Sequence, residues 1–389
     1  KRVNSKFPVI VEHMPYEQFA APVRINTYFT QFGYISLFVR ARGTGKSEGE
    51  VQFLSPREGQ DGKNIVDWAA YKLENSDGRV AIMGCSWPGA IAMTDAAYVG
   101  KNSPLKAVAA SCSGIGNMNT QSWMTGGMPS MSIHQFKALG TQLVGEKSST
   151  VRFFKEVSES IFNGEDLAYE GKYWSERENF SLAEKIVEND VPLLLWAGWG
   201  DIVETGTVRA YTALQNASSK RPVGSPMIKN QKTSPKYQLI MGGWGHGEGL
   251  DMGLILQWFE TWVKGVDTGL QNTKTPMHIF ESGTERWINI KGFTEVDKST
   301  QLNLGPKGKL GETLINGKDK LCGEYDAQGR LVKTRDALGN EVEITYTASG
   351  WPQTIQQADK SRISLSYDAK GNITAIEDAL GNVTRYAYD

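Results

Sequence analysis

Cysteine and histidine are both scarce in this chain of 389 residues. The three cysteines are Cys85, Cys112 and Cys322, and the four histidines are His13, His134, His246 and His278. An odd and sparse set of cysteines argues against a fold that is held together by disulfides. No Cys/His spacing suits a structural zinc site. We therefore expect no metal and no cofactor, and few histidines compete for the role of a catalytic base.

A charge excess and long apolar runs are also missing. Lys and Arg number 42 against 43 Asp and Glu, so the net charge is −1, which gives no indication of a nucleic-acid partner. No apolar run approaches the roughly 18 residues that a membrane span needs. No signal peptide is visible, but the chain begins at Lys1 within what reads as a domain. A cytoplasmic and a secreted location therefore both stay open, as does the oligomeric state.

Short apolar runs alternate with amphipathic stretches over most of the chain before residue 272. The expected strands are 7–14, 34–41, 79–84, 105–112, 191–198 and 237–243. The expected helices are 59–74, 206–215, 254–265 and the segment after Pro88. Strands that are apolar throughout and separated by helices are typical of a parallel sheet covered on both faces. The pattern predicts an α/β protein with a doubly wound, mostly parallel sheet.

Residues 118–185 interrupt this alternation and are rich in Met, Trp and Phe. We interpret the segment as a helical insertion over one end of the sheet, although an ordinary pair of crossover helices fits the periodicity equally well. Within it, Trp123, Phe153 and Trp174 indicate either an apolar or aromatic acyl pocket or plain core packing.

The character of the sequence changes after residue 272. Residues 273–318 contain short runs that read as strands, and a repeat begins near residue 319. The repeat shows in tyrosines that recur every 21 residues, with glycines at the same interval: Tyr325, Tyr346, Tyr367 and Tyr388, and Gly329, Gly350 and Gly371. A fixed period of this kind predicts an array of stacked β units over 319–389. Asp and Asn in the repeats are candidate calcium ligands, but turn positions are the favoured interpretation.

The stretch "GCSWPG" carries the first catalytic candidate, Ser86. It follows an apolar strand and precedes a helical segment, which is the setting of a nucleophile elbow. The tight turn needs glycines close to the serine, and Gly84 and Gly89 supply them. Pro88 falls in the first helical turn, where it costs no hydrogen bond. The second glycine lies one place later than in a plain G-x-S-x-G pattern, so a structural turn is the alternative for this motif alone.

Two further residues favour Ser86 as a nucleophile. A serine hydroxyl needs a base to take its proton, and the base needs an acid to orient it. Asp201 in "GWGD" follows one expected strand, and His246 in "GGWGHG" follows the next. Sites in open α/β sheets form at the carboxyl ends of strands, and the order Ser, Asp, His is that of the nucleophile-elbow hydrolases. Glu204 and Asp251 are the reserve candidates for the acid.

The oxyanion of such a reaction needs two hydrogen-bond donors. We expect one to be the backbone N–H of Trp87, the residue after the nucleophile. The other is the phenolic hydroxyl of Tyr16, in the loop after the first strand, unless Tyr16 is only a half-buried packing residue. Cys85 is expected to pack under the sheet near Cys112, as two thiols and not a disulfide.

The segments "MPYEQF", "GYISLFVRARGTGKSEGE", "GCSWPGA", "GWGD", "GGWGHG" and "WFETWVKG" together resemble the X-Pro dipeptidyl-peptidase and cocaine esterase family of α/β-hydrolases. The resemblance covers about residues 7–272 and extends weakly to 312. It implies Ser86 as nucleophile, Asp201 as acid, His246 as base and Tyr16 as oxyanion donor. Trp87 stands where the family usually has tyrosine. Family members hydrolyse acyl esters or amides, carry a helical cap and end in a jelly roll.

The resemblance defines the expected domains. Residues 1–272 form the α/β-hydrolase domain with a cap at 118–185, 273–318 begin a truncated jelly-roll-like region, and 319–389 resemble Rhs/YD repeats. The family's opening hairpin would precede Lys1, and the junction at about 319 suggests a fragment or a fused reading frame. The expected function is a serine hydrolase acting on a small ester, an amide or a short peptide, including X-Pro dipeptides. The alternative is a non-catalytic surface or secretion-associated repeat module with a relict hydrolase domain.

Overall fold

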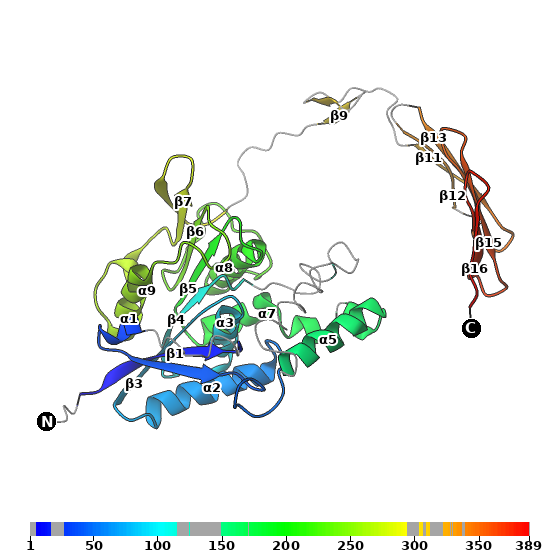
Figure 1. Cartoon of the computed structure of the whole chain (residues 1–389). Coiled ribbons are helices and arrows are strands. Elements are labelled where there is room, and N and C mark those ends of the chain that lie inside the picture. Colours follow the sequence, from blue (N-terminus) through cyan, green and yellow to red (C-terminus); the bar gives the residue numbers. More distant parts are fainter. Residues whose placement is uncertain are drawn as a thin grey trace. The chain divides into compact units, whose positions relative to one another are not determined.

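The computed structural model describes residues 5–16, 27–114, 124, 149–169, 171–293, 303–305, 309–311, 322–326, 328, 330–336 and 339–388. The chain divides into two compact units, residues 1–295 and 296–389 (Figure 1). In the described part of the chain, no helix has the length and apolar character that a membrane crossing requires.

The first unit is built on an eight-stranded sheet in the order β2-β1-β3-β4-β5-β6-β7-β8. Its strands are β1 (Phe7–Met14), β2 (Ile35–Arg40), β3 (Ser76–Cys85), β4 (Leu105–Ser111), β5 (Leu193–Gly198), β6 (Tyr237–Gly242), β7 (Met277–Glu281) and β8 (Arg286–Ile290). All neighbours are parallel except β7 and β8, which are antiparallel. The prediction of a mostly parallel α/β sheet is confirmed.

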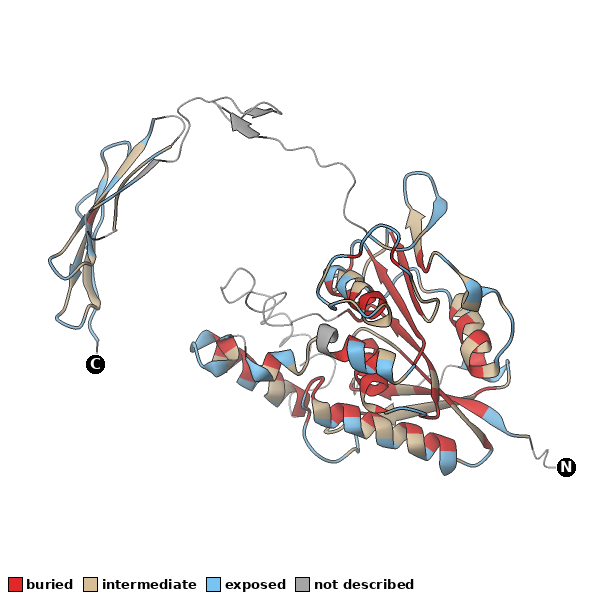
Figure 2. Ribbon diagram, turned by 180° about the vertical axis from the view of Figure 1, so that it is seen from behind, coloured by how far each residue is buried: buried red, intermediate tan, exposed pale blue. Residues whose placement is uncertain are grey.

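Helices cover both faces of this sheet (Figure 1). The described α-helices of this unit are α1 (Thr27–Thr30), α2 (Pro56–Tyr71), α3 (Trp87–Tyr98), α5 (Ser149–Phe162), α6 (Lys172–Ser175), α7 (Asn179–Glu188), α8 (Glu204–Ser218) and α9 (Met252–Phe259). Adjacent strand residues alternate between the two faces: Val80 and Ile82 pack with α2, α3, α7 and α8, whereas Ala81 and Met83 pack with α9. The central strands are therefore buried on both sides, as Figure 2 shows in red, which is why they read as continuous apolar runs.

Two details differ from the sequence-based expectation. β7 and β8 extend the first sheet, with Leu239 of β6 paired to Met277, so residues 277–290 do not belong to a separate jelly-roll-like region. Met277 is fully buried against the sheet core, and this burial holds the strand in the first unit. The segment interpreted as a cap, residues 118–185, contains helices of both expected kinds. Leu182 and Ile186 of α7 pack in the main core, as a crossover helix does. In contrast, α5 packs beside Trp87. Most of 115–148 lies outside the described residues.

The second unit contains a seven-stranded antiparallel sheet in sequential order. Its strands are β11 (Cys322–Tyr325), β12 (Leu331–Arg335), β13 (Glu341–Tyr346), β14 (Pro352–Gln356), β15 (Arg362–Tyr367), β16 (Ile373–Glu377) and β17 (Val383–Arg385), and β9 (Asn303–Gly305) pairs with β10 (Lys309–Gly311) separately. Asp368 accepts hydrogen bonds from the backbone N–H groups of Lys370 and Asn372, and Asp378 does the same at the next turn. These carboxylates close turns, which supports the turn interpretation over calcium binding.

Candidate active site

Ser86 lies at a sharp turn between β3 and α3, at the carboxyl edge of the sheet. Its backbone has φ of +66°, a region that a non-glycine residue adopts at a cost of about 1–3 kcal/mol and that clusters at functional sites. A Cβ at Gly84 would come within 2.5 Å of the Pro88 backbone, and one at Gly89 within 2.6 Å of the Ser111 carbonyl. The close approach explains both glycines of the motif.

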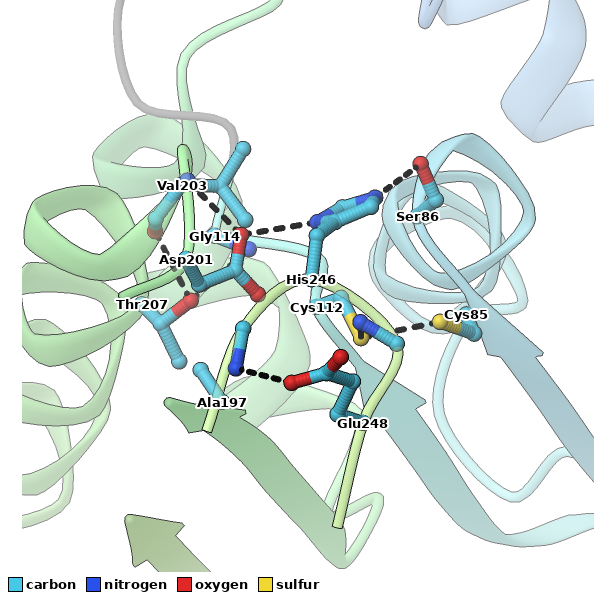
Figure 3. A network of polar contacts seen from close by, with 12 residues as sticks. Cys85, Ser86, Cys112, Gly114, Ala197, Asp201, Val203, Thr207, His246 and Glu248 are labelled. Carbon is cyan, nitrogen blue, oxygen red and sulfur yellow. Dashed lines mark hydrogen bonds and ion pairs between the residues drawn. The ribbon is translucent and has the colours of Figure 1, made fainter. Parts of the chain in front are cut away.

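His246 reaches Ser86 from the loop after β6 (Figure 3). Its Nε2 lies 2.8 Å from Ser86 Oγ, and its Nδ1 lies 2.7 Å from Asp201 Oδ1. The Asp201 side chain is fully buried, whereas that of His246 is about one-third exposed. The hydrogen bond to Asp201 raises the pKa of His246 above its usual value, which strengthens the imidazole as a base. The three residues that the sequence singled out thus form one hydrogen-bonded chain.

Tyr16, two residues after the end of β1, completes this group of side chains. Its hydroxyl lies 3.2 Å from Ser86 Oγ and 3.3 Å from the backbone nitrogen of Trp87. Burial raises the pKa of Tyr16, so the phenol stays protonated and able to donate. Arg40 donates a hydrogen bond to the Tyr16 carbonyl and holds this segment in place. The Trp87 N–H donates to the Tyr16 hydroxyl, and this hydroxyl donates to Ser86 Oγ, so the two expected oxyanion donors lie next to each other beside the serine.

The reserve candidates lie elsewhere. Glu204 accepts a hydrogen bond from Thr205, and Asp251 caps α9 by accepting from the backbone of Gly253 and Leu254. Among the other histidines, His13 pairs with Asp95 in the interior, and His278 contacts Asn289 and Gln238. His134 is outside the described residues.

Two residues that hold the loops of the site in place were not among the candidates predicted from the sequence. Glu248 accepts a hydrogen bond of 2.8 Å from Gly245 N–H and so closes the loop around His246. Trp244 donates from Nε1 to the Ala197 carbonyl, and its own carbonyl accepts from Gly200 N–H. These two Trp244 bonds join the loop after β6, which carries His246 and is called the base loop below, to β5 and the loop after it, which carries Asp201. Trp244 lies inside the quoted "GGWGHG" segment and Glu248 follows it directly, but neither residue type indicated these contacts.

An aromatic cluster borders the nucleophile on the side of α5. Phe53 lies 5.0 Å from the Trp87 ring centre and 5.8 Å from those of Phe153 and Phe154. Phe153 is only partly buried in this cluster. Trp174 is 2% exposed and donates to the Leu167 carbonyl, so it belongs to the core. The predicted pocket residue Trp123 is outside the described residues.

Within the described part of the chain, one group of side chains has metal-ligating atoms close together. Cys112, Asp201 and His246 each offer one such atom, all within 4.8 Å of one another. The Asp201 oxygen and the His246 nitrogen Nδ1 are already hydrogen-bonded to each other. A metal held there would have to break the contact that orients the imidazole toward Ser86.

The sheet order, its two helical layers and the site at the strand ends define an α/β-hydrolase. The family model described as X-Pro dipeptidyl-peptidase (S15 family) matches residues 1–248, so the chain belongs to this family, and the resemblance seen in the sequence is confirmed. A model described as RHS Repeat matches residues 325–362 and 367–389. No curated protein matches the chain.

Solved structures share the fold. An alpha-amino acid ester hydrolase superposes with a TM-score of 0.60 at 17% identity, covering 83% of this chain and 60% of that one. An aminopeptidase from a marine sediment archaeon, Thaumarchaeota archaeon, gives 0.61 at 16% identity, covering 84% and 62%. A CocE/NonD family hydrolase from Staphylococcus aureus gives 0.57 at 18% identity, covering 81% and 57%. The chain thus spans about 60% of the length of these structures.

Replacing Tyr16 with phenylalanine is expected to lower kcat of the hydrolysis proposed below by about 100-fold to 1,000-fold, with KM little changed, because an oxyanion donor acts only in the transition state. Steady-state kinetics with an activated ester measure this. Tyr98→Phe is the matched control, since the Tyr98 hydroxyl accepts an exposed hydrogen bond from Lys185 and lies at the end of α3 away from Ser86. An unchanged kcat in Tyr16→Phe, with Tyr98→Phe also unchanged, would remove Tyr16 from the oxyanion site.

Proposed function

We propose that the protein is a serine hydrolase that cleaves acyl esters or amides through an acyl-enzyme on Ser86. The observation that carries the proposal is the unbroken contact chain from Asp201 through His246 to Ser86, with contacts of 2.7 and 2.8 Å. A serine activated by a histidine that a buried aspartate orients is the arrangement that nucleophilic acyl transfer requires.

In the proposed reaction, Ser86 Oγ attacks the substrate carbonyl and His246 Nε2 takes its proton. The buried carboxylate of Asp201 stabilises the imidazolium that forms. The Trp87 N–H, which donates to the Tyr16 hydroxyl at rest, and the Tyr16 O–H then donate to the developing oxyanion. His246 then returns the proton to the leaving alcohol or amine. Water repeats the sequence on the acyl-enzyme and releases the acid.

The aromatic cluster of Phe53, Trp87, Phe153 and Phe154 supports a substrate with an apolar acyl or leaving group. The family description supports X-Pro dipeptides as one substrate class. Esters of small apolar acids are the broader class, because the site residues act on the carbonyl and do not depend on the leaving atom.

Trapping the intermediate tests this proposal. With p-nitrophenyl esters we expect a burst of p-nitrophenol and an intact mass increased by one acyl group, mapped to the peptide that contains Ser86. X-Pro p-nitroanilides, run in parallel, separate peptidase from esterase activity. Turnover with no adduct on Ser86, or an adduct on another residue, would contradict the proposed mechanism.

A non-catalytic repeat module is the competing function, and the match of residues 325–389 to RHS repeats favours it. In that case the hydrolase unit would be a relict. Folded protein that hydrolyses none of these esters or anilides would support it. The retained contacts among Ser86, His246, Asp201 and Tyr16 argue for the enzyme.

A further inference from the structure

Two thiols meet directly beneath the candidate site. Cys85 is the last residue of β3 and precedes Ser86, and Cys112 follows the last residue of β4. The two strands are parallel neighbours, with Cys85 paired to Ser111. Both cysteines are free, and their sulfur atoms lie 2.8 Å apart. The expectation of two thiols near each other fits this geometry, but Cys85 is only half-buried and lies beside the base loop.

The base loop rests on this thiol pair (Figure 3). Gly247, the residue after His246, donates its N–H to Cys112 Sγ at 3.1 Å. A Cβ at Gly247 would come within 3.7 Å of Cys85 Sγ, so the loop passes over both sulfur atoms. Gly247 also has φ of +75°, which favours glycine at this position. Whether the two sulfur atoms are thiols or a disulfide therefore affects the position of His246.

The two thiols are chemically unequal. The hydrogen bond with Cys112 lowers the pKa of Cys85, and the same contact together with burial raises the pKa of Cys112. Cys85 is thus the sulfur that deprotonates first, and the thiolate is the reactive form. Cys112 is 2% exposed and stands ready as the resolving thiol. An oxidant that reaches the half-buried Cys85 would meet the more readily ionised of the two thiols, with a partner thiol in contact.

We propose that Cys85 and Cys112 form a redox modification site, which takes a peroxide and closes to a disulfide that slows the hydrolase. The Cys85 thiolate attacks one peroxide oxygen, the O–O bond breaks, and the leaving hydroxide takes up the proton that the Cys85 thiol released, so that a sulfenic acid and water form. Cys112 then attacks the Cys85 sulfur, the S–S bond forms and a second water leaves. The thiol pair loses two electrons and two protons, and the peroxide is reduced to two waters.

The disulfide would disturb the base loop in two ways. Its sulfurs stand about 2.05 Å apart, so the pair must close from 2.8 Å. Closing this gap displaces one or both sulfur atoms, and Cys112 Sγ is the acceptor of the Gly247 N–H, so we expect the bond that supports the His246 loop to weaken. Because a small misplacement of a catalytic group is costly, we expect kcat to fall about tenfold. This effect on rate rests on the proposed function, whereas disulfide formation itself does not.

The experiment uses the full chain, treated with hydrogen peroxide and then with dithiothreitol. We expect a mass loss of about 2 Da, a linked Cys85–Cys112 peptide in a non-reducing digest, and a loss of ester hydrolysis that dithiothreitol restores. Cys322→Ser is the matched control and should keep the whole response, since Cys322 lies in the second unit. Cys85→Ser should abolish the linked peptide and the reversible loss of activity.

Absence of the linked peptide after peroxide would overturn the proposal, and so would a linked protein with undiminished kcat. A reduced protein without any hydrolase activity would overturn the proposed function instead. In that event the peptide map alone decides whether the modification site exists.

Discussion

Ser86→Ala is expected to lower kcat for ester hydrolysis by about a million-fold, leaving only the rate that binding and the oxyanion donors supply. The reason is that His246 Nε2 lies 2.8 Å from the Ser86 oxygen, which is the nucleophile that it activates in the proposed mechanism. His246→Ala should cost about as much, and the double variant no more than either single one, because the residues act as a unit. Single-turnover kinetics on active-site-titrated protein measure these losses.

Ser103→Ala is the matched control for this comparison. Ser103 is buried before β4, at the opposite end from the site, and accepts a hydrogen bond from Leu105 N–H. It should retain the wild-type kcat. If Ser86→Ala kept more than a few per cent of the wild-type rate, another residue would have to be the nucleophile.

Asp95→Ala is expected to have the largest effect on stability, about 3–5 kcal/mol of the free energy of unfolding. Asp95 Oδ2 lies 3.0 Å from His13 Nδ1, and both residues are 1% exposed. The pair joins the strand that leads to Tyr16 with the helix that begins after Ser86. Removing one partner leaves the other polar group buried without compensation. Urea unfolding, followed by fluorescence, measures the loss.

The stability that the His13–Asp95 pair contributes is expected to decrease as the pH rises. Burial lowers the pKa of His13, but the Asp95 carboxylate outweighs it and the pKa stands above its ordinary value. The stability that the pair contributes is therefore fully present below the unfolded histidine pKa of about 6.5 and is lost as pH rises through the folded pKa. We expect the cost of Asp95→Ala to be larger at pH 5.5 than at pH 8. Glu58, whose pKa burial raises to about 7 with a smaller contribution from the Asp95 charge, also titrates between these two pH values.

A paired replacement separates burial from charge. His13→Leu with Asp95→Leu should recover much of the stability, because two apolar groups leave no polar atom unpaired. An Asp95→Ala protein within 1 kcal/mol of wild type at both pH values would show that the pair contributes little.

The sequence predicted the sheet and the candidate residues because both depend on local signals. Buried parallel strands are continuous apolar runs, and Ser86, Asp201 and His246 each follow such a run. Parallel strands bring their carboxyl ends to one edge, so order along the chain was enough to place three distant residues together.

Contacts between distant segments could not be predicted in the same way. His13 and Asp95 are 82 residues apart, and each sits inside an element whose periodicity says nothing of the partner. The sequence predicted short strands at β7 and β8 but not the sheet to which they belong. The pairing of β7 with β6, and of β8 with β7, assigns them to the first sheet. The position of Cys85 depended on the direction of one side chain at the elbow, which a pattern of residue types does not define.

Fluorophosphonate labelling of the intact protein tests the central claim, an activated serine at position 86, most directly. The reagent reacts with a serine only when a positioned base has activated it. We expect one equivalent of label on the Ser86 peptide in wild type and none in Ser86→Ala or His246→Ala, all three folded by circular dichroism. Folded wild-type protein that takes up no label, or equal labelling of His246→Ala, would show that Ser86 is not activated by His246.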